Sequence, residues 1–218
     1  MPFGITVFKT AAFNRSAIPP KALGPAPQLH RAPLQRDAVS VQRLKRMERI
    51  SYNESMIDED YMRLALEEAR RAADAGEVPI GAVVVFEPHD PATRRPLALP
   101  RIVACAGNRR ERDRDPAGHA EFSAMLQASR ELDAWRLSGC TVYVTLEPCI
   151  MCAGLMHQVR IDRCVYGARD PKAGALGSLY RINEDSRLNH TFEVVSGVLE
   201  EECADVLRRF FADRRKKR

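Results

Sequence analysis

Two short motifs constrain this chain more than any other feature: His119-Ala120-Glu121, and the pair Cys149-x-x-Cys152 further along the sequence. A Cys-x-x-Cys pair that opens a helix places two thiolates on one face, where a single tetrahedral ion can bind both. His119 also precedes an apolar-periodic segment, and a helix N-terminus favours the thiolate form that zinc requires. Three protein ligands leave one coordination position for water, which is typical of a catalytic zinc site. The motifs therefore predict one zinc ion, bound by His119, Cys149 and Cys152.

Glu121 follows the ligand histidine by two residues, so we expect it beside the bound water and not as a fourth ligand. Zinc lowers the pKa of bound water from about 15.7 to about 7, which makes a nucleophile available at neutral pH. A nearby carboxylate can accept the proton of that water and pass it to a substrate nitrogen. Glu121 is thus the predicted catalytic acid/base.

Two other interpretations of the cysteine pair have to be weighed. A Cys-x-x-Cys at a helix start can be a thioredoxin-like redox pair, but such a pair requires no His-x-Glu upstream. A structural zinc site needs a fourth protein ligand, for which Cys140 and His157 are the candidates nearby. Neither has the paired spacing that structural sites favour. Both interpretations explain less of the sequence than a catalytic zinc site does.

The charge balance is basic, with a formal net charge of +5 and a pI near 9.0, and it favours a polyanionic partner such as nucleic acid. A hydrophobic fraction of 45% is sufficient for a packed core. The sequence contains no apolar run long enough to span a bilayer, so we expect no membrane association. Four of the six cysteines occur singly in apolar surroundings, which indicates a reducing compartment and therefore the cytoplasm.

Composition divides the chain into three parts. Residues 1–56 are expected to be a disordered basic extension, because prolines interrupt any periodicity and Asp37 is the single acidic residue before position 47. This segment could be an organellar transit peptide, or translation could start at a later methionine. Residues 57–213 form the predicted zinc-dependent domain, and residues 214–218 a basic tail. Within the domain, Glu87 to Pro100 is too long and proline-rich for a tight hairpin turn, so we expect a surface insertion.

Hydrophobic periodicity predicts four helices and five strands. The first helix has Asp58 as its expected N-cap, Gly76 as its stop, and Glu67 and Arg71 as an i,i+4 pair. The other expected helices cover 119–132, 148–159 and 199–210, and the expected strands cover 79–86, 101–106, 140–145, 163–166 and 191–195. This order implies a three-layer α/β/α domain with a central mixed sheet of about five strands.

The residues around the predicted ligands carry a more specific resemblance. The segments that carry it are Pro79-Ile80-Gly81-Ala82, Asp115-Pro116-x-x-His119-Ala120-Glu121, Thr145-Leu146-Glu147-Pro148-Cys149-x-Met151-Cys152-Ala153-Gly154 and Gly167-Ala168-Arg169-Asp170-Pro171-Lys172-x-Gly174-Ala175-x-Gly177-Ser178. His-x-Glu followed by Pro-Cys-x-x-Cys is the signature of zinc nucleobase deaminases. The chain closely resembles bacterial tRNA-specific adenosine deaminases, members of the cytidine deaminase-like superfamily, from about Asp58 to Phe211. The resemblance includes neither the N-terminal extension nor the insertion.

This resemblance implies a homodimeric enzyme that converts the wobble adenosine of a tRNA anticodon to inosine. Carried over by position, Asn108 corresponds to a substrate-contacting asparagine and Asp170 to a loop residue that meets the anticodon backbone. The end of the last helix, with Arg208 and Phe211, corresponds to a segment that touches the RNA. A backbone N–H at the Pro148 to Cys149 helix start could orient the substrate pocket.

Three uncertainties follow from the residues themselves. Asp170 could instead form a turn by accepting hydrogen bonds from nearby amides. The same zinc chemistry would serve a deaminase of a free base or nucleoside, of the guanine or cytosine type. A catalytically inactive RNA-binding subunit is a further hypothesis, but an inactive subunit has no chemical reason to carry Glu121.

Overall fold

The structure is a computed structural model that describes residues 57–90 and 92–216. The predictions for the N-terminal extension, and for the last two residues of the basic tail, lie outside the described residues. No helix in the described part of the chain is both long and apolar enough to cross a membrane.

The core of the domain is a five-stranded sheet with the strand order β2-β1-β3-β4-β5. Its strands are β1 (Gly81–Phe86), β2 (Arg101–Gly107), β3 (Cys140–Leu146), β4 (Arg163–Ala168) and β5 (Glu193–Ser196). Strand β1 pairs antiparallel with β2 and β3, whereas β3, β4 and β5 run parallel. The predicted mixed sheet is therefore confirmed, with strand ends within about two residues of those expected.

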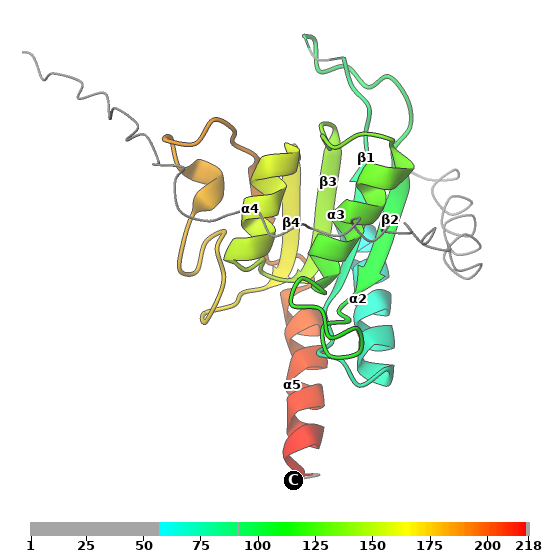
Figure 1. Ribbon diagram of the computed structural model, residues 1–218, viewed down its shortest axis with the longest axis vertical. Coiled ribbons are helices and arrows are strands. Elements are labelled where there is room, and N and C mark those ends of the chain that lie inside the picture. Colours follow the sequence, from blue (N-terminus) through cyan, green and yellow to red (C-terminus); the bar gives the residue numbers. More distant parts are fainter. Residues whose placement is uncertain (1–56, 91, 217–218) are drawn as a thin grey trace, which may run out of the picture. The chain divides into compact units, whose positions relative to one another are not determined.

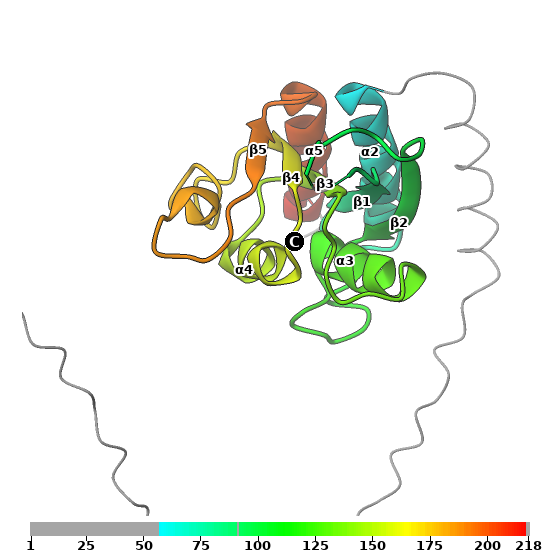
Figure 2. The same ribbon diagram turned by 90° about the horizontal axis from the view of Figure 1, so that it is seen from above.

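Helices cover both faces of this sheet. Helices α2 (Asp58–Asp74) and α5 (Glu200–Lys216) lie on one face, and α3 (Ala120–Glu131) and α4 (Ile150–Val159) lie on the other (Figures 1 and 2). Because side chains alternate along a strand, Val83 and Val85 pack into the core on the α2 side, and Ala82 and Val84 into the core on the other side. The arrangement confirms the predicted three-layer α/β/α fold.

The start of α2 differs from the prediction. The N-cap is Ile57, whose backbone N–H donates a 3.1 Å hydrogen bond to the Asp60 carboxylate. Asp58, predicted as the N-cap, is instead the first helical residue, and it binds the Arg163 guanidinium through two hydrogen bonds of 2.7 Å. The Asp58 carboxylate therefore forms a long-range ion pair and does not cap the helix, contrary to the prediction from the local sequence pattern.

Other features of the first helix agree with the sequence. Gly76 follows α2 with a φ of +81°, a left-handed conformation that glycine adopts without strain, so the helix ends where expected. Glu67 and Arg71 form the expected i,i+4 ion pair at 3.4 Å. Gly81, where β1 begins, allows α2 to approach closely, since a Cβ there would lie 2.0 Å from the Ala65 carbonyl oxygen.

The predicted insertion has no buried residue among positions 87–90 and 92–100, as expected for a surface segment, whereas two other parts of the chain differ from the prediction. The insertion between β1 and β2 is anchored at its Arg94, which donates a 3.0 Å hydrogen bond to Asp162. A short 3-10 helix, η1 (Ile182–Glu184), lies in the segment expected to be loop. Helix α5 continues to Lys216, so Arg214, Arg215 and Lys216 are helical and do not follow the helix as a tail.

Candidate metal and catalytic site

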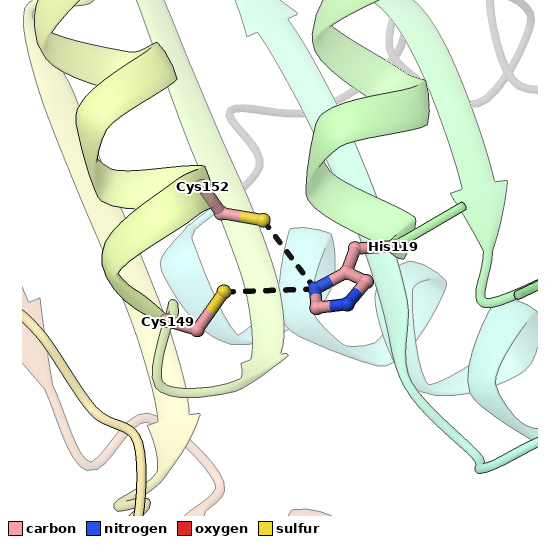
Figure 3. A group of neighbouring side chains, drawn as sticks. All are labelled: His119, Cys149 and Cys152. Carbon is pink, nitrogen blue, oxygen red and sulfur yellow. Dashed lines mark hydrogen bonds between the residues drawn. The ribbon is translucent and has the colours of Figure 1, made fainter. Parts of the chain in front are cut away.

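The predicted ligands meet where α3 and α4 begin. His119 is the N-cap of α3, Cys149 is the N-cap of α4, and Cys152 lies in the first turn of α4. Figure 3 shows the two sulfur atoms facing the histidine ring, and each Sγ is 3.6 Å from His119 Nδ1. Both helices point their N-termini toward this cluster, so both helix dipoles favour negative charge on the thiols.

The three donor atoms fit a zinc ion. A tetrahedral zinc with Zn–N near 2.05 Å and Zn–S near 2.3 Å has its nitrogen and sulfur ligand atoms about 3.6 Å apart. The observed Nδ1–Sγ separations match this value, and all three donor atoms lie within 4.8 Å of one another. Two sulfurs and an imidazole are also a donor set that suits zinc. The residues present therefore fit the ion that the sequence predicts.

The thiol pKa values explain why the pair needs a cation. Hydrogen bonds from Cys152 and His119 outweigh burial and lower the pKa of Cys149 to about 4. The pKa of Cys152 is raised, first by its hydrogen bond to the Cys149 sulfur and then by burial. One thiol therefore ionises at the expense of the other, and two adjacent thiolates require a positive ion between them.

Glu121 lies beside this cluster, in the first turn of α3. Its side chain is 4% exposed, and burial raises its pKa against the opposing effect of hydrogen bonds from its own amide and from Cys152. A buried carboxyl with a raised pKa can exchange a proton at neutral pH, as a general acid/base must. The structure thus brings together the catalytic residue and the three ligands predicted from the sequence.

The structural and redox interpretations find less support. Among residues 57–90 and 92–216, His119, Cys149 and Cys152 are the one grouping of side chains that could hold a metal. Cys140, a candidate fourth ligand, is buried at the other end of β3, where it pairs with Phe86. His157, the second candidate, is buried beside His190, with ring centroids 6.0 Å apart. A redox pair would also leave the contact of both sulfurs with His119 unexplained.

Asn108 lies on the loop after β2 and is nearly buried. Its side-chain amide donates a 3.3 Å hydrogen bond to Glu77, and its backbone N–H donates to the Ile80 carbonyl. Glu77 also accepts hydrogen bonds from the backbone N–H groups of Glu111 and Arg112, at 3.3 and 2.6 Å. Glu77 therefore orders the loop that leads to His119.

The loop after β4 is attached directly to the start of α4. The Ala175 N–H donates a 2.9 Å hydrogen bond to the Pro148 carbonyl, and Gly174 forms an isolated β-bridge with Cys149. Asp170 begins this loop, and its Oδ1 accepts hydrogen bonds from the amides of Lys172 and Ala173 at 2.9 and 3.2 Å. The turn-forming role considered for Asp170 is therefore present, and its predicted contact with RNA stays a prediction.

Arg208 and Phe211 lie apart from the zinc ligands, on α5 and so on the opposite face of the sheet (Figure 2). Arg208 pairs with Glu201 at 2.9 Å and with Asp205, both on its own helix. Phe211 is 43% exposed and packs edge-on against Phe210. Helix α5 continues past the end of the sheet at which α3 and α4 begin (Figure 1), which leaves its last turns accessible to a large substrate.

Two buried carboxylates near the site were not predicted from the sequence. Glu77 and Glu147 are each 2% exposed, and both accept hydrogen bonds from loop amides. In the sequence, each is a glutamate among apolar residues at the end of a helix or strand. Such a position suggests a buried carboxylate with a partner, since a charged residue is buried only when it is paired. Their partners are backbone groups, which have no sequence signature.

Comparison with known proteins places the chain in a family. The family of MafB19-like deaminases matches residues 56–215. A tRNA-specific adenosine deaminase from Bacillus subtilis is 46% identical over 161 residues, which cover 74% of this chain and 92% of that protein. This chain belongs to the tRNA-specific adenosine deaminase family. A second member, from Haemophilus influenzae, is 42% identical and covers 75% of this chain and 88% of its own length.

Solved structures agree with this assignment. A chain from a study of A-to-I editing by tRNA:A34 deaminases at the wobble position has a TM-score of 0.60 and 41% identity. The match covers 68% of this chain and 99% of that chain. A guanine deaminase from Nitrosomonas europaea matches with a TM-score of 0.58 and 25% identity, covering 76% of this chain and 92% of its own. The expected cytidine deaminase-like fold is confirmed, and the family resemblance found in the motifs is confirmed with it.

Proposed function

We propose that this protein deaminates adenosine to inosine at the wobble position, position 34, of a tRNA anticodon, as its relatives' names describe. The observation that carries the proposal is the pairing of a His-Cys-Cys donor set with a buried Glu121 at the start of two adjacent helices. The reaction is a hydrolysis, in which the oxygen of water bonds to C6 of adenine, the exocyclic C–N bond at C6 breaks, and ammonia leaves.

His119, Cys149 and Cys152 are the residues that would hold one zinc ion in each chain. Zinc bound by them would polarise a water molecule and lower its pKa, so that a nucleophile forms near neutral pH. Glu121 would accept a proton from the attacking water on its carboxylate and deliver it to N1 of the adenine ring. A second proton transfer by the same carboxyl, to the exocyclic nitrogen, allows ammonia to leave.

Other residues are proposed to bind the nucleotide. Asn108 can fix the nucleoside by hydrogen bonds, since Glu77 holds its side-chain amide in place. A backbone N–H at the Pro148–Cys149 helix start orients the bound nucleoside, and Asp170 approaches the anticodon backbone. Arg208 and Phe211 touch the RNA, and the basic end of α5 binds phosphates without reading bases. The bases of an anticodon loop are unpaired, so extruding one adenine costs less than flipping a base from a duplex.

The deciding experiment is a deamination assay of purified, zinc-loaded protein. Its substrates are an anticodon stem-loop with adenosine at the wobble position, the same stem-loop with adenosine moved to a neighbouring position, and free adenosine, guanine and cytidine. We expect inosine in the first stem-loop alone. Turnover of a free compound with the stem-loop untouched would contradict the proposal and support a deaminase of free bases or nucleosides.

A guanine deaminase is the second candidate, because one such enzyme shares this fold at 25% identity. The relatives from Bacillus subtilis, Haemophilus influenzae and Streptococcus pyogenes, at 46%, 42% and 35% identity, are each named tRNA-specific adenosine deaminase, which favours the first candidate. The basic end of α5 is a further argument, since a free base offers no phosphates for it to bind.

We also propose a homodimer in the cytoplasm. Ile150, Leu179 and Tyr180 are 56%, 52% and 53% exposed, and Ile150 and Leu179 both adjoin the Cys149–Gly174 bridge. These apolar side chains are the candidate contact with a second copy, which light scattering on a sizing column would test through an Ile150→Glu variant. None of the six cysteines forms a disulfide, which supports a reducing compartment.

A further inference from the structure

Glu147 lies in the chain between the end of β3 and the Pro148–Cys149 helix start, and its carboxylate is hydrogen-bonded to the loop after β4. Its Oε1 accepts hydrogen bonds from the backbone N–H groups of Leu176 and Ser178, at 3.2 and 2.9 Å. Its Oε2 accepts from the Asp170 N–H at 3.0 Å and from the Ser178 hydroxyl. One buried side chain therefore holds both ends of the segment 170–178.

The loop is shaped around this carboxylate. A Cβ on Gly174 would lie 2.3 Å from the Glu147 carboxyl carbon, so the backbone can pass only because position 174 has no side chain. Gly174 also bridges Cys149, and Ala175 donates to the Pro148 carbonyl. The Glu147 carboxylate and the Pro148–Cys149 segment are consequently both in contact with the same short piece of chain.

We propose that Glu147 is a positioning residue for the deamination reaction: it holds segment 170–178 against the Pro148–Cys149 turn, so that Cys149 and the substrate-facing Asp170 keep one fixed separation. The inference rests on the proposed function, because it assigns the loop to substrate. A metal ligand and a substrate-contacting loop have to be held to a fraction of an ångström for the reaction to proceed. Here a single carboxylate does so from between them.

The chemistry of the four donors explains why a carboxylate is required. Each oxygen accepts two hydrogen bonds, and all four partners are donors. A glutamine in the same place retains one oxygen and turns an NH₂ group toward the other two donors. Glu147→Gln is therefore nearly isosteric, and it releases one end of segment 170–178 while the other end stays bound.

The test compares wild type with Glu147→Gln and with Ser178→Ala, which removes one of the four hydrogen bonds. Glu59→Gln, an exposed change on α2, is the control. Three quantities are measured: kcat and KM on the anticodon stem-loop with zinc-loaded protein, zinc retention against a chelator, and hydrogen exchange of the backbone amides of residues 170, 176 and 178. All assays are run well below the melting temperature of each variant.

We expect kcat per bound zinc to fall about 10- to 100-fold in Glu147→Gln, as for partners that orient metal ligands, and to fall less in Ser178→Ala. Amide exchange in the loop should accelerate in the same order, with the control unchanged. A purely structural carboxylate would lower the melting temperature and leave kcat per bound zinc at the wild-type value, and this result would overturn the inference. So would unchanged exchange at all three amides.

The outcome for wild type separates this inference from the proposed function. If wild type fails to deaminate the stem-loop but turns over a free base, the proposed function is wrong. The same variants are then assayed on that base, and loss of kcat with faster loop exchange would still support the positioning role of Glu147.

Discussion

Asp58 and Arg163 are 105 residues apart in the sequence and form a two-pronged ion pair, with both hydrogen bonds at 2.7 Å. The pair joins the start of α2 to the start of β4, and Tyr143 on β3 donates a third hydrogen bond of 2.9 Å to the same carboxylate. Arg163 also contacts Glu193 on β5 at 3.4 Å. The Asp58 carboxylate therefore ties the first helix to two neighbouring strands, and Arg163 extends the connection to a third.

This ion pair makes stability depend on pH. The hydrogen bond from Arg163 is the main influence, and it holds the pKa of Asp58 below its ordinary value against the opposing effect of burial. Because the pKa of Asp58 is lower in the folded protein, the ion pair contributes fully to the free energy of unfolding above the unfolded pKa of about 3.9. This contribution is lost as the pH falls through the pKa of Asp58 in the folded protein. We expect Asp58→Asn to reduce the free energy of unfolding by about 1–2 kcal/mol at pH 7. Urea unfolding between pH 3 and 7 measures the difference in free energy of unfolding between this variant and wild type, and this difference should become smaller below pH 4.

Glu59→Gln is the matched control for that series. Glu59 pairs with Arg63 on the exposed side of the same helix, with both side chains about half exposed. Water and salt screen such a pair, so its loss should leave the unfolding midpoint unchanged at every pH. An equal loss of stability in both variants would mean that Asp58 acts only through the charge of the helix terminus.

Two glycines should respond oppositely to alanine. A Cβ on Gly167, in β4, would lie 2.3 Å from the Cys203 sulfur, whereas nothing lies within 4 Å of the corresponding position at Gly154, inside α4. Gly167→Ala should therefore cost about 1–3 kcal/mol by forcing α5 away from the sheet. Gly154→Ala should raise the free energy of unfolding by about 0.5–1 kcal/mol, because alanine favours a helix interior. Urea denaturation measures both, and destabilisation by Gly154→Ala would contradict the open space beside it.

The grouping of His119, Cys149, Cys152 and Glu121 could be predicted from the sequence because each pair lies within one helical turn. His119 and Glu121 share the start of α3, and Cys149 and Cys152 share the start of α4. Local spacing therefore fixes their relative placement, and the regular alternation of helices and strands brings the two helix starts together.

The parts that could not be predicted depend on contacts between distant segments. A polar residue at a helix start resembles an N-cap, and nothing local shows that Asp58 is bound by Arg163. Glu147 is bound by backbone amides of a loop more than twenty residues away, and backbone groups are the same in every sequence. The end of α5 was underestimated because a run of basic residues reads as a solvated tail.

The basic end of α5 should divide into structural and RNA-binding positions. Arg214 donates a 3.0 Å hydrogen bond to the Gly76 carbonyl and lies 4.9 Å from the centre of the Phe210 ring, so it joins α5 to the end of α2. Arg214→Gln should lower the melting temperature. Arg215→Gln and Lys216→Gln, at exposed positions, should leave the melting temperature unchanged and weaken stem-loop binding.

The salt dependence of binding tests this division. Each lost phosphate contact should reduce the slope of log K against log salt concentration by about 0.7–0.9. Fluorescence anisotropy on the stem-loop at several salt concentrations gives the slope. An unchanged slope in the double variant of Arg215 and Lys216 would place these residues outside the RNA contact.

The last prediction concerns Glu121, which can be changed without disturbing the ligands. Glu121→Gln keeps the size of the side chain and removes its ability to accept and return a proton, so zinc content and melting temperature should stay at wild-type values. The rate of inosine formation should fall by about 10²- to 10⁴-fold, the usual contribution of a general acid/base. His119→Ala is the contrasting variant, because it removes a ligand and should reduce zinc content together with activity. Metal analysis and single-turnover assays on the stem-loop separate the two effects. Wild-type turnover in zinc-loaded Glu121→Gln would show that another group moves the proton, and the buried position of this carboxyl would then need a structural explanation.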